Sequence, residues 1–407
     1  MYNFVVFVVS VVSFISGVQG KGVILTPKES HMYTFNYFAF IKEHNVNHLA
    51  TFGDFVLYKT NMNNYNRYKN TFNHLFDVEE EQVYKVPDYR VKSFVSGCKN
   101  EEPDVFVGGV NGVFDKKDSV PWHLDRISKR HLPLDGTYPY SEAGSCHKNS
   151  EVDIETVVVD TGCDVSHPEF EGRAEFLENF TDDGENYDGN NHGTFCGGIV
   201  TSKTYGVCKD AKVKCVKVLT ADGSGSTSGV IAGMEYTFKR HLEQEKENPK
   251  LRTIMSMSLG GGYSFMMNRA VERMVKSSDT FYIVVAAGNE NQNIRLTSPA
   301  SAKGILTIMA MGKDDQRAYF SNYGSASFYS TGVEVKSIIP GGKTAVYSGT
   351  SFSCPTTVGI LNHYLDQFPH LNMKQIKEKM LEDATKDTIE ENPKNTPNLM
   401  SYLYRED

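Results

Sequence analysis

Apolar segments that alternate with helical segments constrain the fold of this chain more than any other feature. Runs rich in Val, Ile, Leu and Met recur through the chain, separated by helical patterns or glycine-rich turns. Strands separated by helices favour a parallel sheet that is covered on both faces. The predicted fold class is therefore α/β, a three-layer domain with a mostly parallel central sheet. The predicted strands are residues 156–160, 212–219, 253–259, 282–288 and 305–311, and the predicted helices are residues 230–243, 267–277, 358–365 and 372–388.

The beginning of the chain has the pattern of a targeting segment. The apolar run from Phe4 to Val18 is shorter than the about 20 residues of a membrane span, and residues 18–20 suit a cut before Lys21. Residues 1–20 are therefore predicted to be a signal peptide. The alternative is an uncleaved anchor, because the segment lacks an initial Lys or Arg. The signal predicts a secreted protein, or one delivered to a vacuole-like compartment by the secretory route.

Three further segments follow the signal. Residues 21–90 are predicted to form a small α+β domain, which its position before a larger domain marks as a propeptide. Residues 91–118 are rich in Gly, Asp and Lys and are predicted to be a linker, and residues 119–407 the large domain. Within the small domain, strands are predicted at residues 23–25, 51–60 and 83–86, and helices at residues 36–43 and 64–76.

Charge and cysteine content exclude some functions. The net charge is −8 and no basic block occurs, so nucleic acid and anionic membranes are not expected as partners. The seven cysteines contain no Cys-x-x-Cys pair, which argues against a zinc ribbon or a thioredoxin motif. Loss of Cys98 with the leader would leave an even number, whose pairing the sequence cannot decide.

A carboxylate ends the first predicted strand. Asp160 follows three valines, where a charge is costly unless it accepts hydrogen bonds or meets a positive partner. A simple strand-end turn is one alternative. The Asp-Thr-Gly of an aspartic protease is another, but that chemistry needs two carboxylates and the sequence contains no second Asp-Thr-Gly or Asp-Ser-Gly.

Three more polar residues stand at positions suited to chemistry. His192 precedes Gly-Thr and a run of small residues, and the absence of a second His at metal-ligand spacing gives no predicted metal site. Asn289 follows an apolar run, as a turn residue or as an amide donor for an oxyanion. Ser351 opens a helical run, where the alternative to a nucleophile is an N-cap.

The chain order Asp160, His192, Ser351 predicts a catalytic triad. In this interpretation Ser351 attacks a carbonyl, His192 takes its proton, and Asp160 orients the imidazole. The Asn289 amide and the Ser351 backbone N–H would bind the oxyanion, aided by the dipole of the helix. The other common order, Ser, Asp, His with Gly-x-Ser-x-Gly, is not present.

From about residue 120 to residue 403 the chain resembles the subtilisin-like serine proteases (the peptidase S8 family), most closely the branch of proteinase K and fungal vacuolar protease B. The resemblance implies a serine endopeptidase that cleaves protein or peptide substrates through an acyl-enzyme. It also implies a monomeric zymogen whose own propeptide is an intramolecular inhibitor. The matching motifs are residues 120–127, 159–162, 167–174, 192–194, 205–207, 216–219, 222–225, 258–262, 286–289, 298–301, 320–324 and 348–351.

The resemblance also implies how substrate binds. An extended peptide would lie between two edge strands, with main-chain hydrogen bonds for affinity and pockets for selectivity. Small residues in the first pocket suggest room for a sizeable uncharged side chain. A proprotein-processing enzyme would need acidic residues there, and Glu290 alone is near. The implied substrate-binding residues are Gly223, Ser224, Ser258, Leu259, Gly260, Ala286, Ala287 and Gly288.

The chain departs from the family in several places. Phe195 stands where the family usually has His, and residues 352–357 replace its usual Met-Ala-x-Pro-His-Val. These departures support the alternative of a catalytically silent subtilisin-like binding or surface protein. No cofactor is expected to be required. Residues 325–331 contain no carboxylate, so the strong calcium site of proteinase K is not predicted, whereas calcium binding elsewhere stays open.

Overall fold

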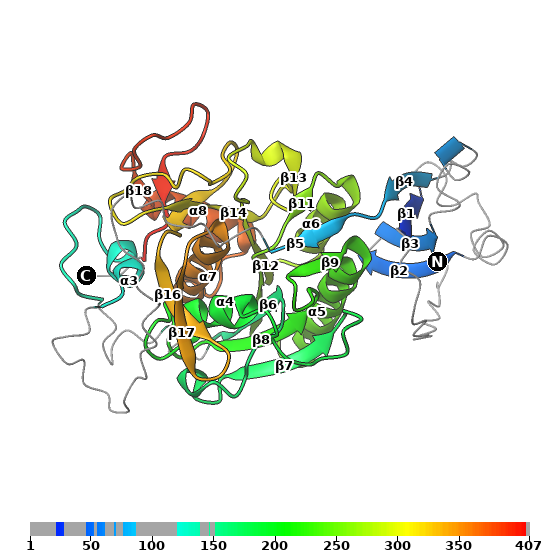
Figure 1. Cartoon of the computed structure of the whole chain (residues 1–407), viewed down its shortest axis with the longest axis horizontal. Helices are drawn as coiled ribbons and strands as arrows, with labels where there is room; N and C mark the ends of the chain where they lie inside the picture. Colours follow the sequence, from blue (N-terminus) through cyan, green and yellow to red (C-terminus); the bar gives the residue numbers. More distant parts are fainter. Residues whose placement is uncertain are drawn as a thin grey trace, which may run out of the picture.

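The structure, a computed structural model, describes residues 22–27, 46–52, 55–61, 69–70, 76–86, 120–138, 146 and 151–403. A large domain and a small four-stranded sheet lie side by side along the long axis of the molecule (Figure 1). The predicted signal peptide and the predicted linker lie outside the described residues. No helix in the described part of the chain is long and apolar enough to cross a membrane.

A nine-stranded sheet forms the middle of the large domain, in the order β18-β19-β15-β14-β12-β10-β6-β8-β7. All neighbours from β19 to β7 run parallel, and β18 pairs antiparallel with β19. Its strands are β6 (Asp153–Asp160), β7 (Ala174–Asn179), β8 (Lys212–Lys217), β10 (Leu251–Met257), β12 (Phe281–Ala286), β14 (Leu306–Met311), β15 (Phe328–Thr331), β18 (Thr385–Lys386) and β19 (Leu399–Met400).

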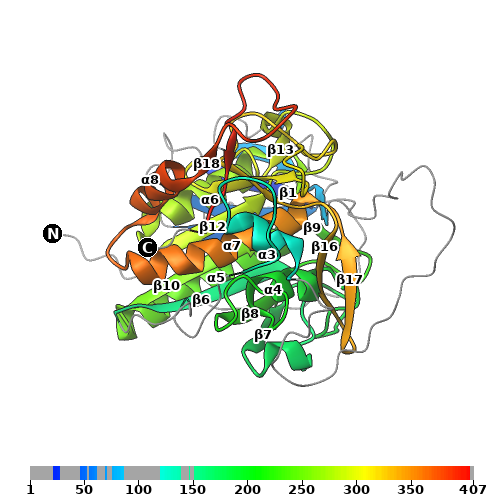
Figure 2. The ribbon, with the colours of Figure 1, turned by 90° about the vertical axis from the view of Figure 1, so that its left-hand side faces the viewer.

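Helices cover both faces of this sheet. Met255 and Met257 of β10 pack in the core that α5 and α6 cover, whereas Ile254 packs in the core shared with α4 and α7. Figure 2 shows α7 crossing the middle of the domain. The predicted three-layer α/β fold is confirmed. The helices are α3 (Trp122–Ile127), η3 (Pro168–Phe170), α4 (His192–Thr201), α5 (Thr227–Glu247), α6 (Phe265–Ser277), η4 (Ile294–Leu296), α7 (Thr350–Gln367) and α8 (Met373–Asp383).

Polar side chains fix where the surface helices begin. The Ser226 hydroxyl accepts a hydrogen bond from a backbone N–H in the first turn of α5, and Ser264 does the same for α6. Asn372 and Gln375 form a capping box at α8. Each cap satisfies a backbone donor that has no partner within its helix. Two short antiparallel pairs complete the domain. β11 (Gly261–Gly262) pairs with β13 (Thr297–Ser298), and β16 (Val335–Ile339) and β17 (Lys343–Tyr347) form a hairpin.

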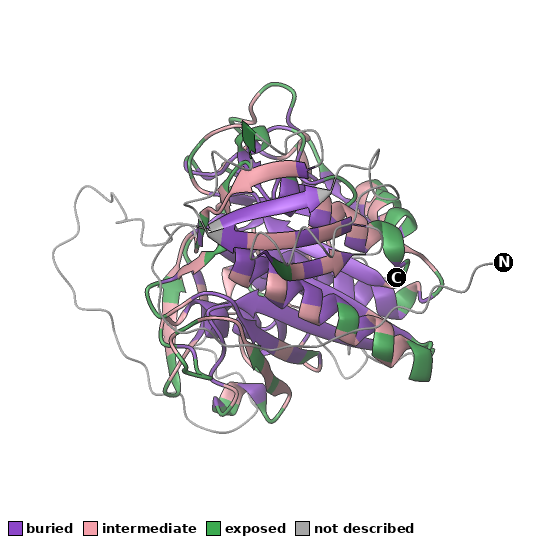
Figure 3. Ribbon diagram, turned by 90° about the vertical axis from the view of Figure 1, so that its right-hand side faces the viewer, coloured by how far each residue is buried: buried purple, intermediate pink, exposed green. Residues whose placement is uncertain are grey.

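The small sheet has the order β2-β3-β1-β4 and is antiparallel. Its strands carry buried residues, and Phe52 and Leu57 join the same core as α5 and α6 (Figure 3). The apolar face of the small sheet therefore rests on these two helices. Its strands are β1 (Gly22–Pro27), β2 (Asn47–Phe52), β3 (Phe55–Asn61) and β4 (Phe76–Glu80).

Two predicted elements are wrong in part, and two others lie mostly or wholly outside the described residues. Residues 51–60 are not one strand, because Phe52 pairs with Phe55 and the segment folds into the β2–β3 hairpin. The helix predicted for residues 372–388 ends at Asp383, since Thr385 pairs with β19 instead. Most of the helix predicted for residues 64–76 and all of that for residues 36–43 lie outside the described residues.

Two disulfides resolve the pairing that the sequence left open. Cys163–Cys215 joins the turn after β6 to β8, and Cys146–Cys208 joins two loops. Cys196 and Cys354 are free and buried. The Cys163–Cys215 bond therefore tethers the segment that immediately follows Asp160.

Replacing both Cys163 and Cys215 by Ala should lower the free energy of unfolding by about 2–4 kcal/mol, because the unfolded chain regains the freedom of a long loop. Guanidinium unfolding of the purified protein measures this. Cys196→Ala is the matched control, because it removes a buried cysteine and no cross-link. Equal unfolding midpoints for the double variant and the original protein would contradict the prediction.

Candidate active site

The candidate site lies where three neighbouring parallel strands end. Asp160 is the last residue of β6, Ser258 follows β10, and Ala287 follows β12. These strands are adjacent in the sheet, in the order β12-β10-β6. Parallel sheets bring the carboxyl ends of their strands to one edge, where α/β proteins place their sites.

Asp160 and His192 form a buried hydrogen-bonded pair. The Nδ1 of His192 lies 2.8 Å from Oδ1 of Asp160, and both residues have no exposed surface. Because a carboxylate oxygen only accepts, the imidazole Nδ1–H is the donor. The backbone N–H of Thr161 donates to the same oxygen at 2.7 Å. This pairing fixes the tautomer and leaves Nε2 to act as a proton acceptor.

A second buried carboxylate holds the start of α4, the helix whose first residue is His192. Oδ2 of Asp188 accepts from the Thr194 N–H at 2.8 Å, and Oδ1 accepts from the Asn191 N–H at 2.9 Å. A carboxylate is favourable at a helix N-terminus. Oδ1 of Asp188 also accepts from the Thr161 hydroxyl at 2.8 Å, and that hydroxyl accepts from the Gly193 N–H at 2.9 Å. Asp188 thus ties the end of β6 to the beginning of α4.

Glycine at position 193 permits this close contact. A Cβ there would lie 2.0 Å from the backbone oxygen of Gly162, which no side chain tolerates. The buried ammonium group of Lys217 holds the same turn from another side. It donates to the Thr161 oxygen at 3.0 Å and the Leu219 oxygen at 2.8 Å, and pairs with Asp183 at 3.0 Å. The turn after Asp160 is therefore held by contacts from both Gly193 and Lys217.

Ser351 is the second residue of α7 and is fully buried. Its Oγ donates to the backbone oxygen of Ser258 at 3.4 Å, and the Ser258 hydroxyl donates to the Ser351 oxygen at 2.7 Å. The N-cap of α7 is Gly349, so the alternative that Ser351 caps the helix is wrong. The serine hydroxyl sits at the positive end of a helix that packs against α4, the helix of His192.

Asn289 is oriented by the residue before Ser351. Its Oδ1 accepts from the Thr350 N–H at 2.9 Å and from the Thr350 hydroxyl at 2.8 Å. The same hydroxyl accepts from the Gly288 N–H at 3.0 Å. Because both bonds engage the oxygen end of the amide, the Nδ2 donor faces the opposite direction. Sequence reasoning missed Thr350, although its place inside Gly-Thr-Ser made it visible.

A strand from the N-terminal region lies in the cleft beside these residues. β5 (Val83–Lys85) pairs antiparallel with β9 (Ser224–Ser226). On its other side Lys85 exchanges two 3.0 Å backbone hydrogen bonds with Gly260, and the Val86 N–H donates to the Gly223 oxygen at 2.9 Å. The strand predicted for residues 83–86 is therefore present, but it joins the large domain and not the small sheet.

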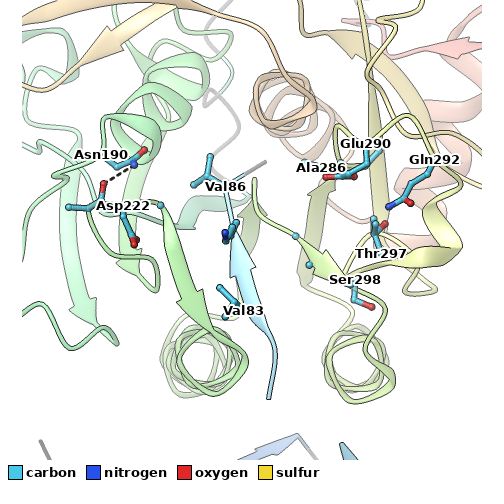
Figure 4. A pocket seen from close by; sticks show the side chains of 18 residues that line it. Val83, Val86, Asn190, Asp222, Ala286, Glu290, Gln292, Thr297 and Ser298 are labelled. Carbon is cyan, nitrogen blue, oxygen red and sulfur yellow. Dashed lines mark hydrogen bonds between the residues drawn. The ribbon is translucent and has the colours of Figure 1, made fainter. Parts of the chain in front are cut away.

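The cleft around β5 is a cavity of about 690 Å³ (Figure 4). Of the predicted substrate-binding residues, Gly223, Gly260 and residues 286–288 line it. Ser224 pairs with Lys85 in β5, and Ser258 holds Ser351. The side chain of Leu259 lies in the core, so it does not reach the cavity. Residues that sequence reasoning missed also line it, namely Asn190, Ala221, Asp222, Gln292, Thr297, Ser298 and Ala300.

The described residues contain two groups of potential metal ligands. One group is Asp160, His192 and Cys196, and the second includes the Cys146–Cys208 disulfide. Neither is the all-oxygen set that calcium prefers. Burial raises the pKa of the Cys196 thiol well above its ordinary value and that of Cys354 to about 12, so both are neutral thiols near pH 7.

The sequence profile of the subtilase family matches residues 155–400, which include Asp160, His192, Asn289 and Ser351. The chain belongs to the subtilase family. A subtilisin-like serine protease of Rhodotorula mucilaginosa, Rho m 2.0101, is 37% identical over 303 residues, which cover 71% of this chain and 87% of that protein. This subtilase is therefore a serine endopeptidase, and its substrates are proteins or peptides.

Further similar proteins support the assignment to this family. The cuticle-degrading protease of Metarhizium anisopliae is 38% identical over 297 residues, 72% of either chain. Cerevisin of Saccharomyces cerevisiae is 37% identical over 309 residues, which cover 71% of this chain and 47% of cerevisin. The crystal structure of a cold adapted subtilisin-like serine proteinase superposes with a TM-score of 0.63 at 31% identity and covers 71% of this subtilase and 100% of that chain.

Gly193→Ala should lower kcat/KM of this subtilase by about a hundredfold, because a Cβ against Gly162 displaces His192 from Asp160, and small displacements of reacting groups have costs of this size. Hydrolysis of a peptide substrate by the matured protein measures it. Gly197→Ala is the control in the same helix, since its Cβ would meet only side-chain carbons of Phe170 and Val213, the nearest at 3.3 Å, and no backbone atom. Equal losses in the two variants would contradict the prediction.

Proposed function

We propose that Asp160, His192 and Ser351 are the catalytic triad of a peptide-bond hydrolase that is made as a zymogen. The observation that carries this proposal is the buried 2.8 Å hydrogen bond between His192 and Asp160. His192 lies on α4, which packs against α7, the helix that bears Ser351. In the proposed reaction Ser351 Oγ attacks the scissile carbonyl while Nε2 of His192 takes the hydroxyl proton. The imidazolium then gives this proton to the leaving amine.

Asp160 would stabilise the imidazolium without itself taking a proton. The oxyanion of the tetrahedral intermediate would be bound by the Nδ2 of Asn289 and the backbone N–H of Ser351. The acyl group left on Ser351 is released when water attacks it, with His192 again acting as the base. This chemistry needs no cofactor, because the chain's own residues supply the nucleophile, the base and the oxyanion donors.

The proposed substrate lies as an extended strand between β9 and Gly260. The hydrogen bonds of β5 support this, because they use backbone groups alone and any peptide can make them. Selectivity would then come from the pockets, with residues 286–288 forming the wall of the first. Calcium is not part of the proposal. The Ser327 hydroxyl accepts from the Thr307 N–H at 3.2 Å, and no carboxylate stands in residues 325–331.

We further propose that residues 21–90 are an inhibitory propeptide that fills the cleft until it is removed, with residues 91–118 as the linker. The position of β5 supports inhibition, because a second extended chain cannot pair with the same edges. The apolar run of residues 4–18 supports entry into the secretory route, and therefore a secreted or vacuole-like location for a monomeric enzyme.

Two carboxylates join this segment to the large domain at the beginnings of two helices. Glu81 accepts from the N–H of Ser228 at 3.1 Å, from its hydroxyl, and from Lys59 at 3.2 Å. Burial alone would raise the pKa of Glu81, but these partners outweigh it and lower the pKa. Glu79 accepts from the Met266 N–H at 3.2 Å, and its Oε1 is buried without a hydrogen-bond partner in the described residues. Burial raises the pKa of Glu79.

The matured protein should react with a fluorophosphonate probe at Ser351, and Ser351→Ala should abolish this labelling and lower kcat by about 10⁶-fold. Asn289→Ala should lower kcat by about 10²–10³-fold because one oxyanion donor is lost. Labelling is read by mass spectrometry of the probe-modified peptide. A folded wild-type protein, free of residues 21–90, that the probe does not label would contradict the proposed function and favour a silent binding protein.

Glu81→Gln should weaken the docking of residues 22–86 by about tenfold at neutral pH, because it removes charge-assisted hydrogen bonds. The lowered pKa of Glu81 means that its contribution is present above the pKa of the undocked carboxyl and is lost as the pH falls through the docked value. Glu79→Gln is the matched variant, because the pKa of Glu79 is shifted in the opposite direction. Its raised pKa makes docking stronger as Glu79 becomes protonated, so Gln should leave docking at neutral pH unchanged or stronger.

Hydrogen exchange of the β1–β5 amides measures this docking in the uncut Ser351→Ala chain, after correction for intrinsic exchange rates. A greater loss of protection in Glu79→Gln than in Glu81→Gln at neutral pH would contradict the assignment of the two carboxylates.

A further inference from the structure

Three aromatic rings form a compact cluster beside the catalytic histidine. The ring centroid of Phe195 lies 4.7 Å from that of Tyr347 and 4.7 Å from that of Phe352. Tyr347 and Phe352 are 5.9 Å apart. Each distance falls in the range of favourable aromatic pairs. The three residues come from α4, β17 and α7, so the cluster joins the helix of His192 to the helix of Ser351.

The cluster touches His192 itself. The Phe352 centroid lies 5.6 Å from that of the imidazole, with the ring planes 49° apart. Phe195 and Phe352 are both fully buried. The Sγ of Cys196 lies 3.8 Å from Nδ1 of the same ring. The ring is therefore enclosed by side chains in addition to its hydrogen bond with Asp160.

A hydrogen bond at one ring atom restrains the tilt of an imidazole less than packing against the ring does. The Nδ1–Asp160 contact fixes one atom of the His192 ring, while Nε2, the atom that must accept the Ser351 proton, lies on the far side. A tilt about the Nδ1 contact would move Nε2 most. A large, rigid aromatic ring packed beside the imidazole resists this motion better than a smaller aliphatic side chain, because the planar ring cannot change its shape.

We propose that Phe352, supported by Phe195 and Tyr347, is a positioning residue that holds the His192 ring in register with Ser351. This inference rests on the proposed triad. It explains why the two departures from the family pattern nearest to the triad occur together. Phe195 and Phe352 contact one another, so each ring fills space that the other depends on. The two rings act as one packing unit, so neither residue is an independent departure from the family pattern.

The chain contains a matched cluster far from the site. His241 packs against Phe281 with centroids 5.2 Å apart and planes 52° apart, and Phe281 lies 5.0 Å from Phe238. Phe281 is buried and begins β12, whereas the catalytic residues lie beyond the other end of that strand. A substitution there removes the same ring from a similar aromatic–histidine contact without reaching the triad.

The test compares Phe352→Leu with Phe281→Leu in the matured enzyme. Phe352→Leu should lower kcat by about 10–100-fold and leave KM within about twofold, because the substrate cleft is intact and the base is misplaced. The second-order rate of fluorophosphonate inactivation should fall by a similar factor. Phe281→Leu should lower the melting temperature to a similar degree and keep kcat within about twofold, as expected for a buried ring with a structural role alone.

Rates are normalised to the concentration of probe-reactive sites, so that loss of folded protein does not count as loss of turnover. Unchanged kcat in Phe352→Leu, or an equal fall in kcat in Phe281→Leu, overturns the proposal. If the probe does not label the wild-type protein, the proposed triad itself is wrong. This outcome distinguishes failure of the triad from failure of the role proposed for Phe352. Tyr347→Leu is a milder second variant, since Tyr347 is only half-buried, and it should lower kcat by about threefold to tenfold without changing KM.

A double substitution tests whether the rings act as a unit. The double variant Phe195→Leu/Phe352→Leu should lose no more activity than the more damaging of the two single variants. Once one ring is absent, the other ring has lost its support, so removing it as well costs little more. Independent, multiplicative losses would overturn the coupling of Phe195 to Phe352.

Discussion

The buried carboxylate of Asp160 is the group on which the rest of the site depends. An ionised side chain at the end of a buried strand is stable only if hydrogen bonds replace its lost water. His192 and the Thr161 backbone supply them. This requirement places the first residue of α4 against the last residue of β6. The helix in turn reaches that place only because Gly193 lets it approach Gly162, and because Asp188 satisfies the donors at its start.

Much of the fold follows from the sequence because buried parallel strands need little beyond continuous apolar residues. The strand that ends at Asp160, and the one before Asn289, are visible for this reason. Contacts between distant segments are not visible. Asn190 reaches the cleft because its amide donates to the Ala221 oxygen at 2.9 Å, a loop contact without a local pattern. Likewise Lys217 looks like an ordinary strand residue until its three partners are known.

Two departures from the family sequence pattern are misleading when each is considered separately. Phe195 and Phe352 are separated in sequence, and each looks like erosion of an active site. In the structure their rings are 4.7 Å apart and both are buried. Neither ring carries a polar atom that would need a hydrogen-bond partner there. Two substitutions that share one space are compatible with a packed and working site, whereas unrelated losses would leave cavities or unsatisfied groups.

Two cross-links act on the short turn after Asp160. The Cys163–Cys215 disulfide and the Lys217 ammonium group both connect this turn to β8 or to the segment after it. A disulfide that served global stability alone would gain most by closing a long loop anywhere on the surface. Here a covalent bond and a hydrogen bond from a buried ammonium group converge on one turn beside the carboxylate that contacts His192. Their placement is better explained by the precision that the proposed catalytic pair, Asp160 and His192, requires than by stability alone.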